Sequence, residues 1–284
     1  MTNNKTEPLV SVIIPTYNRA KLLPRAIKSV LGQTYKNIEL VIVDDCSTDD
    51  TRAVIKNFSQ NDKRIKYLFH KKNKGAAAAR NTGIKASGGK YIAFQDSDDK
   101  WIHDKLEKQM EIFNNFPNRN FVVYTSFLKI GKEEASYFPY CRDVKKKNGM
   151  LFDELLIRNF IGFPTILLKK ECLENVGLLD ESFPRNQDWE LFLRLSKIYP
   201  FKFVDEPLVL SFDTPGSISS KPELFIQARK LILKKYESDI KKNKAIWAKH
   251  EHDLGIHELK YDSKTSGIIR LLKAKILITV SKIT

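Results

Sequence analysis

The stretch Val10-Ser11-Val12-Ile13-Ile14-Pro15-Thr16-Tyr17-Asn18 decides the fold, because a β-branched strand here ends abruptly in polar residues. Further runs of this character follow, separated by segments in which apolar residues have helical spacing. The strands expected on this pattern are Val10–Ile14, Ile38–Val43, Ile65–Phe69, Tyr91–Phe94 and Phe121–Ser126. Such alternation predicts an α/β fold with a mostly parallel sheet flanked by helices.

The connecting segments predict individual helices. Leu22–Leu31 is expected to cover one face of the sheet, Ser47 to cap a helix that continues through Phe58, and Ile102–Phe113 to form a third helix. Residues 137–212 mix short strands and turns with helices, the clearest at about residues 187–198. We therefore expect one α/β domain over residues 1–220.

The last part of the chain has a different character. From Pro222 onward the pattern predicts helices, with breaks near Gly255 and Ser266. Residues 221–284 carry 15 Lys and Arg against 7 Asp and Glu, a net charge of +8 out of +15 for the whole chain. This part is expected to be a basic helical C-terminal region, and such charge favours an anionic partner.

Composition excludes several classes of protein. Of the 284 residues 42% are hydrophobic, with 17 Phe and 10 Tyr, so the chain can bury a core and is not disordered as a whole. Cys46, Cys141 and Cys172 are odd in number and far apart, which disfavours a disulfide framework or a cysteine zinc site. The polar start, Met1–Pro8, lacks the apolar core of a signal peptide, so a cytoplasmic location is expected.

Polar clusters follow three of the expected strands. They are Pro15–Asn18, Asp44-Asp45 and Asp96-Ser97-Asp98-Asp99. Any one of them could form a turn or cap a helix, but the carboxyl ends of parallel strands meet at one edge, where ligands bind. Adjacent carboxylates repel each other unless a cation or hydrogen-bond donors offset them, and a hard divalent ion is the usual solution.

The order of these motifs resembles the family 2 glycosyltransferases, which have the GT-A fold. The matching segments are Val10–Asn18, Val41–Asp49, Lys74–Asn81, Asp96–Asp99, Gln187–Arg194 and Ser217-Ile218-Ser219. Gln187 stands where the family often has Glu, which puts any role of that first acid in doubt. The resemblance covers roughly residues 9–220 and implies a nucleotide-binding half at about 9–127 and an acceptor half at about 128–220.

For the nucleotide site, the resemblance implies that Tyr17 and Asp45 lie at the nucleoside of a sugar nucleotide, with Asp45 accepting hydrogen bonds from the base. Thr16, next to Tyr17, is expected to bind the same sugar nucleotide. Lys74 and Arg80 would approach the same nucleotide or its diphosphate, where fixed positive charge is useful.

For the metal, the resemblance implies that Asp98 holds Mn²⁺ or Mg²⁺ against the diphosphate, with Asp96 near the ribose and the ion. The ion would act as a Lewis acid on the leaving group. Asn81 and Ser97 are expected to be structural.

Asp188 is the candidate catalytic base. An acceptor hydroxyl must lose its proton as it attacks the anomeric carbon, and a single displacement of this kind inverts the configuration. Asp188 could instead stabilise the start of its helix, and both roles can coexist. The expected activity is inverting transfer from a nucleoside-diphosphate sugar, preferably a UDP-sugar, to a glycan or lipid-linked glycan acceptor in surface polysaccharide or glycolipid synthesis.

Two other functions compete with this one. The net charge of +15 suggests a basic nucleic-acid-binding protein without catalytic activity, but no helix-turn-helix, RNP-type strand or basic-aromatic stripe occurs, so no nucleic-acid partner is expected. A dehydrogenase would need G-x-G-x-x-G after the first strand, where this chain has Pro15–Asn18.

The segment Ile268–Ile283 combines apolar residues with Arg270, Lys273, Lys275 and Lys282, too many charges for a spanning helix. Two readings stay open. It could lie on the acidic inner face of the membrane, or its apolar face could pack on Leu231, Ile232 and other helices. A homo-oligomer paired through this face is a further possibility.

Other basic and histidine residues are expected to be solvated. Lys145-Lys146-Lys147 predicts a solvated loop. His250, His252 and His257 invite a metal hypothesis, but His250 and His252 are two residues apart and point to different helix faces. Trp247 and Leu254 have the spacing of core residues.

Overall fold

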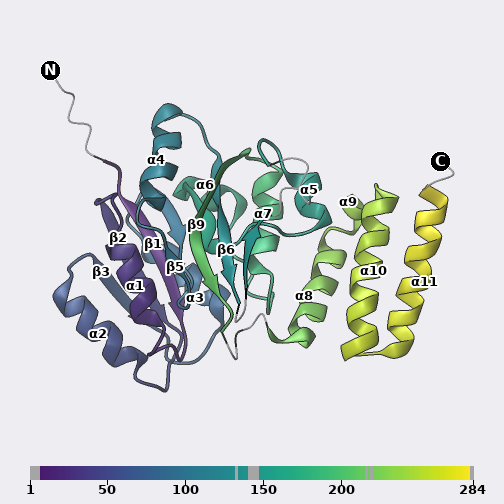
Figure 1. The fold of residues 1–284 in the computed structure, drawn as a ribbon, viewed down its shortest axis with the longest axis horizontal. Coiled ribbons are helices and arrows are strands. Elements are labelled where there is room, and N and C mark those ends of the chain that lie inside the picture. The colour runs from purple at the N-terminus through teal and green to yellow at the C-terminus, as the bar shows by residue number, and fades with distance from the viewer. Residues whose placement is uncertain (1–6, 132–133, 140–146, 215–216, 218–219, 282–284) are drawn as a thin grey trace.

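The computed structural model describes residues 7–131, 134–139, 147–214, 217 and 220–281 (Figure 1). Its strands are β1 Val10–Thr16, β2 Ile38–Asp44, β3 Ile65–Phe69, β4 Tyr91–Phe94, β5 Lys100–Trp101, β6 Val122–Ile130, β7 Ala135–Phe138, β8 Ile166–Lys169 and β9 Phe201–Phe212. Its helices are α1 Leu23–Leu31, α2 Thr51–Asn61, α3 Ala76–Ala86, α4 Lys105–Asn115, α5 Phe152–Ile157, α6 Lys170–Val176, α7 Gln187–Ser196, α8 Pro222–Lys235, α9 Glu237–Lys241, α10 Lys244–Tyr261 and α11 Lys264–Ser281.

One sheet runs through the α/β part in the order β3-β2-β1-β4-β8-β6-β9-β5, and β7 pairs with β6. The strands β3, β2, β1 and β4 are parallel, β8 is antiparallel to both of its neighbours, and β9 is parallel to β6. This confirms the predicted α/β fold with flanking helices. The carboxyl ends of β1, β2 and β4 therefore meet at one edge of the sheet.

Alternating side chains of β1 face two different cores, which explains its continuous apolar run. Ile13 belongs to the core under α3, α5, α6 and α7, while Val12 and Ile14 belong to the core under α1, α2 and α4. A strand covered on both faces by helices has no solvent side and needs no polar alternation. The sheet thus forms the middle of three layers (Figure 1).

Two local predictions for the α/β part are wrong. Ser47 does not cap α2, which begins after Asp50; its hydroxyl instead accepts the N–H of Asn18 at 2.9 Å. The helix α3 was not predicted, because its sequence is rich in alanine and lacks a stripe of large apolar residues. Alanine is the best helix former, and small side chains let α3 lie close against β1 and β2.

Helices α8, α10 and α11 lie side by side at the end of the molecule away from β3 (Figure 1). The predicted break near Gly255 is wrong, since α10 continues through it, and the chain turns at Asp262 and Ser263, just before the predicted break at Ser266. Gly255 permits close helix packing instead: a Cβ there would lie 3.1 Å from the carbonyl oxygen of Gly267. Within the described residues, every helix is too short or too polar to traverse a lipid bilayer.

The expectation of a solvated surface is wrong for His250. Its side chain is buried, its Nε2 donates to the carbonyl oxygen of Leu156 at 2.7 Å, and burial lowers its pKa to about 4. His252 is exposed as expected. The predicted core position of Leu254 is confirmed, and Trp247 is half-buried. Lys145, Lys146 and Cys141 lie outside the described residues.

Candidate active site

A cavity of about 830 Å³ opens at the carboxyl ends of β1, β2 and β4. Its other walls are a 3-10 turn at Phe163–Thr165 and the start of α7. The structure brings nearly all predicted site residues to this cavity: Thr16, Tyr17, Asp45, Arg80, Asp96, Asp98 and Asp188. Lys74 is the exception. Among the described residues, its neighbours Asn73 and Gly75 line the cavity but Lys74 does not.

Asp45 holds the loop that leads into α3. Its carboxylate accepts the backbone N–H groups of Lys74 at 2.8 Å and Gly75 at 2.7 Å, and its Oδ1 lies 2.6 Å from His70 Nδ1. Gly75 has a φ of 89°, which a side chain would strain, and α3 begins directly after it. Both oxygens of Asp45 thus already have partners in the protein, in addition to the predicted contact with a base.

Thr16 and Tyr17 form the cavity wall at the end of β1. The Thr16 hydroxyl is buried and has no hydrogen-bond partner among the described residues, whereas the Tyr17 side chain is 44% exposed. An exposed aromatic ring and a buried hydroxyl in the same cavity wall suit a planar ligand with hydrogen-bonding groups at its edge.

Arg80 links the end of β4 to the start of α7. Its guanidinium donates to Asp96 Oδ1 at 2.6 Å and to Gln187 Oε1 at 3.3 Å, and it lies over the ring of Phe163 at 4.4 Å. Gln187, the departure from the family pattern, therefore accepts from Arg80 without adding a negative charge. The guanidinium is nearly fully buried and fixed in position.

Asp98 and Asp99 lie in a crowded acidic environment. Burial and the neighbouring Asp96 raise the pKa of Asp98. Burial, Asp96 and Asp98 together raise the pKa of Asp99. Asp99 accepts the N–H of Phe212 at 3.1 Å, while the nearest ion-pair partner of Asp98 is Arg19, at 3.9 Å. Among the described residues, no group of three or more metal-ligating side chains occurs.

Asp188 opens on the same cavity from the first turn of α7. Its Oδ1 accepts the N–H of Trp189 at 2.8 Å, and its Oδ2 accepts the side-chain amide of Asn159 at 3.0 Å. Burial raises the pKa of Asp188 to about 6, although these donors and Arg80 oppose the rise. Asp188 thus has the contact expected for a helix start and also a pKa suited to a general base.

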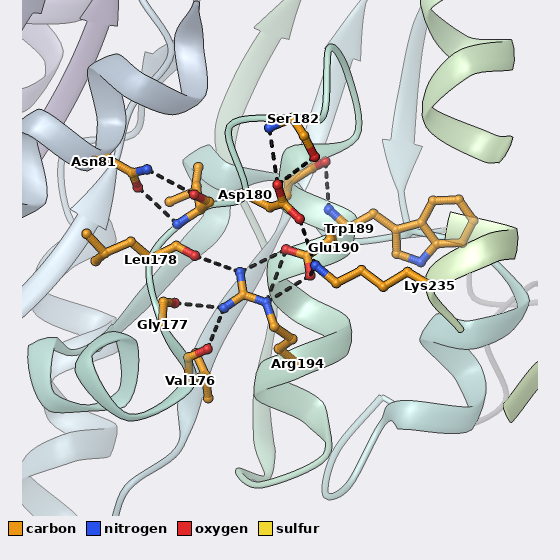
Figure 2. Close-up of polar contacts among 12 residues, drawn as sticks. Asn81, Val176, Gly177, Leu178, Asp180, Ser182, Trp189, Glu190, Arg194 and Lys235 are labelled. Atoms are coloured by element: carbon orange, nitrogen blue, oxygen red, sulfur yellow. Dashed lines mark hydrogen bonds and ion pairs between the residues drawn. The ribbon is translucent and has the colours of Figure 1, made fainter. Parts of the chain in front are cut away.

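An ion-pair network centred on the buried Glu190 holds α7 in place (Figure 2). Arg194 donates to Glu190 at 2.8 Å and to three backbone carbonyl groups, those of Val176, Gly177 and Leu178. Lys235 of α8 lies 2.8 Å from Glu190, which ties the helical region to α7. The arginine that ends the matching segment Gln187–Arg194 therefore orients the helix that carries Asp188.

Asn81 anchors the same loop from α3. Its side-chain amide and the backbone of Leu179 exchange two hydrogen bonds of 2.9 Å each (Figure 2). This confirms its expected structural role.

Two residues near Asp188 were not predicted. Asn159 follows α5, in a segment without a readable motif, and Arg185 stands in the loop before α7. The sequence offers one signal for Arg185, its position three residues before Asp188, and none for Asn159.

The sequence profile described as Glycosyl transferase family 2 matches residues 11–174. The chain belongs to this family. It is 48% identical over 225 residues to an uncharacterised glycosyltransferase of Haemophilus influenzae, an alignment that covers 78% of this chain and 85% of that protein. It is 37% identical over 193 residues to UDP-Glc:alpha-D-GlcNAc-diphosphoundecaprenol beta-1,3-glucosyltransferase WfgD of Escherichia coli, covering 66% and 70% of the two chains.

Longer relatives also exist within the family. The chain spans 26% to 66% of the length of five glycosyltransferases of Rickettsia species that it matches.

Solved structures show the same fold. Staphylococcus aureus TarS 1–349 in complex with UDP-GlcNAc superposes with a TM-score of 0.69 at 20% identity, over 93% of this chain and 79% of that one. The mannosyltransferase PcManGT of Pyrobaculum calidifontis in complex with GDP-Man and Mn²⁺ gives 0.66 at 18% identity, over 99% and 76%.

Proposed function

We propose that this protein transfers a sugar from a nucleoside-diphosphate sugar, preferably a UDP-sugar, to an acceptor hydroxyl, with inversion at the anomeric carbon. One observation carries the proposal: the carboxylates of Asp98 and Asp188 open on one cavity that is roomy enough for a sugar nucleotide. Family membership supports this reading. Roles in surface polysaccharide or glycolipid synthesis, with a lipid-linked glycan as acceptor, fit the acceptor in the name of WfgD.

The residues present fit a divalent ion. Asp98 has oxygen ligands of the kind that Mg²⁺ and Mn²⁺ prefer, and a cation near Asp98 and Asp96 would relieve the repulsion that raises the pKa of Asp98. We assign Asp98, with Asp96, to hold Mn²⁺ or Mg²⁺. Such an ion stabilises the negative charge that develops on a departing diphosphate.

The chain's own residues supply the remaining steps. Thr16, Tyr17 and Asp45 bind the nucleoside. Arg80 adds fixed positive charge beside the diphosphate. Lys74 acts through its backbone N–H, which donates to Asp45 and fixes the loop beside the nucleotide. Asp188 takes the proton of the acceptor hydroxyl as that oxygen attacks the anomeric carbon. Because attack and departure occur on opposite faces of the sugar, a single displacement inverts the configuration.

Calorimetry with UDP, with and without Mn²⁺, tests the donor and metal assignments. We expect weak binding without Mn²⁺, a gain of about 10-fold or more with it, and loss of that gain together with transferase activity in Asp98→Asn. Asp153→Asn, on the exposed face of α5, removes the same charge away from the cavity and should behave as wild type. Equal UDP affinity with and without Mn²⁺ would contradict the metal assignment. Screening donor hydrolysis across common sugar nucleotides identifies the sugar.

The helical region adds a second proposal, peripheral binding to an acidic membrane surface. Ile269, Leu272 and Ile276 on α11 are 60%, 58% and 63% exposed, so they do not pack on the other helices as one reading expected. Lys264 and Lys275 are exposed on the same helix. An outward apolar stripe beside lysines suits the headgroup region of an anionic bilayer.

A further inference from the structure

Two cations line the active-site cavity on the side of α7 and α8. Arg185 stands in the loop before α7, and Lys221 directly precedes α8. Arg185 Nη1 donates to the backbone carbonyl oxygen of Lys221 at 3.4 Å, which places the two residues together. Within the described part of the chain, neither side chain forms an ion pair with a carboxylate.

The other arginines of the cavity are already paired with acids. Arg80 donates to Asp96, and Arg19 lies 3.9 Å from Asp98, so both offset carboxylates assigned to the donor and the ion. Arg185 instead lies close enough to Asp188 to feel its charge, three residues away in sequence. Its positive charge therefore belongs to the side of the cavity where the acceptor hydroxyl must lie.

Among the residues that the structure describes, Arg185 uses little of its hydrogen-bonding capacity. A guanidinium carries five N–H donors, and the bond to Lys221 uses one of them. The side chain is half-buried, with its Cζ 5.4 Å from the centre of the Phe225 ring, and burial lowers its pKa. A partly desolvated cation without a carboxylate partner is costly in the free protein, and that cost is recovered when an anion binds.

We propose that Arg185, supported by Lys221, binds a phosphate group that the acceptor carries. This inference rests on the proposed function. When an acceptor hydroxyl of a hexose lies at Asp188, a diphosphate on the anomeric carbon of that hexose lies across the width of one sugar ring. The planar fork of arginine matches two phosphate oxygens at once. The acceptor class is therefore a sugar linked through a diphosphate to a lipid, and a neutral glycan end binds less well.

Binding of farnesyl diphosphate in the presence of saturating UDP and Mn²⁺ tests the inference without requiring transfer. UDP blocks the donor site, so remaining affinity for the probe reports a second phosphate site. We expect Arg185→Gln to weaken the probe about 10- to 100-fold while leaving UDP affinity within about 2-fold, as expected for a lost charged hydrogen bond. Arg185→Lys should recover part of the affinity.

Lys234→Gln, at an exposed position of α8, removes one positive charge away from the cavity and serves as the control. Farnesol, which lacks phosphate, should bind no better to wild type than to Arg185→Gln. Three results would overturn the inference: equal affinity of wild type and Arg185→Gln for farnesyl diphosphate, no binding of the probe once UDP is saturating, or binding no tighter than that of inorganic pyrophosphate. A protein that binds UDP but fails these tests keeps its proposed activity, whereas failure to bind UDP or hydrolyse any sugar nucleotide contradicts that activity itself.

Discussion

At the scale of single residues, Asp188 combines two opposing influences. Burial raises its pKa to about 6, and the N–H of Trp189 is the strongest of the groups that hold it down. Asp188→Asn keeps the size and the acceptor oxygen but cannot take a proton. We expect turnover to fall about 10²- to 10⁴-fold while UDP affinity, measured by calorimetry, stays nearly unchanged. A large loss of UDP affinity would make Asp188 a structural residue.

The same pKa predicts a dependence on pH. A base must be ionised to act, so kcat/KM should rise as pH increases through about 6 and level off above it. The folded-state pKa is raised, so ionised Asp188 destabilises the fold above this range. Asp188→Asn should therefore have a higher Tm than wild type at pH 8, and the difference should shrink at pH 5.

Asn159 positions Asp188 and does not itself meet substrate in this proposal. Its amide lowers the pKa of Asp188. Asn159→Ala should move the acidic limb of the kcat/KM profile to higher pH and reduce kcat about 3- to 10-fold, a loss of about 1 kcal/mol typical of one hydrogen bond. Asn159→Gln offers the same amide on a longer chain. An unchanged limb in Asn159→Ala would show that the bond is irrelevant to the base.

At the scale of elements, α10 and α11 meet through glycine. A Cβ on Gly267 would lie 2.6 Å from the backbone nitrogen of Leu259 and 2.8 Å from the carbonyl oxygen of Gly255. Helix propensity alone would make Gly267→Ala stabilising by about 1 kcal/mol, whereas backbone contact must push the helices apart at a cost of about 1–3 kcal/mol.

We therefore expect Gly267→Ala to expose α11 to proteolysis and to faster amide exchange. Thr265→Ala, at an exposed position of the same helix, improves propensity without a new contact and should not. Slower exchange in Gly267→Ala would mean that the helices are not in close contact.

Sequence patterns predicted the elements with large apolar residues and missed those that depend on their neighbours. The strands β1, β2 and β4 were readable because each is a short apolar run buried on both faces. The helix α3 was not, because its contacts come from alanine, and the break expected at Gly255 does not exist, because glycine there serves packing against α11. A glycine in a helical pattern can mark the end of the helix or allow close packing against another helix, and only the presence of a partner helix distinguishes the two cases.

At the scale of the whole molecule, the apolar stripe on α11 exposes Ile269, Leu272 and Ile276 to solvent in the free protein. Replacing Ile269, Leu272 and Ile276 together with Gln should leave the Tm nearly unchanged and reduce co-flotation with vesicles containing phosphatidylglycerol about 10-fold or more. Vesicles of phosphatidylcholine alone should bind weakly in both cases. Equal flotation of the triple variant and wild type would contradict membrane binding, and concentration-dependent dimerisation by wild type alone would assign the stripe to a second copy.

The candidate site was predictable to the extent that strand ends determine it. Asp45, Asp96 and Asp98 follow apolar strands, and parallel strands bring their ends together without further information. Arg185 and Asn159 come from loops whose path depends on tertiary packing, so no local pattern marks them. His250 shows the converse error, because a polar residue on a helix was expected at the surface but lies buried beneath the ring of Trp189.

Arg80 has a consequence for the timing of the reaction. The negative charge of Asp96 raises the pKa of Asp188 and the positive charge of Arg80 lowers it, although these residues come from opposite walls of the cavity. In the proposed donor complex, a cation beside Asp96 offsets the first influence, so we expect the proton affinity of Asp188 to fall once a sugar nucleotide is bound. The loaded protein should then act as a base at lower pH than the empty one.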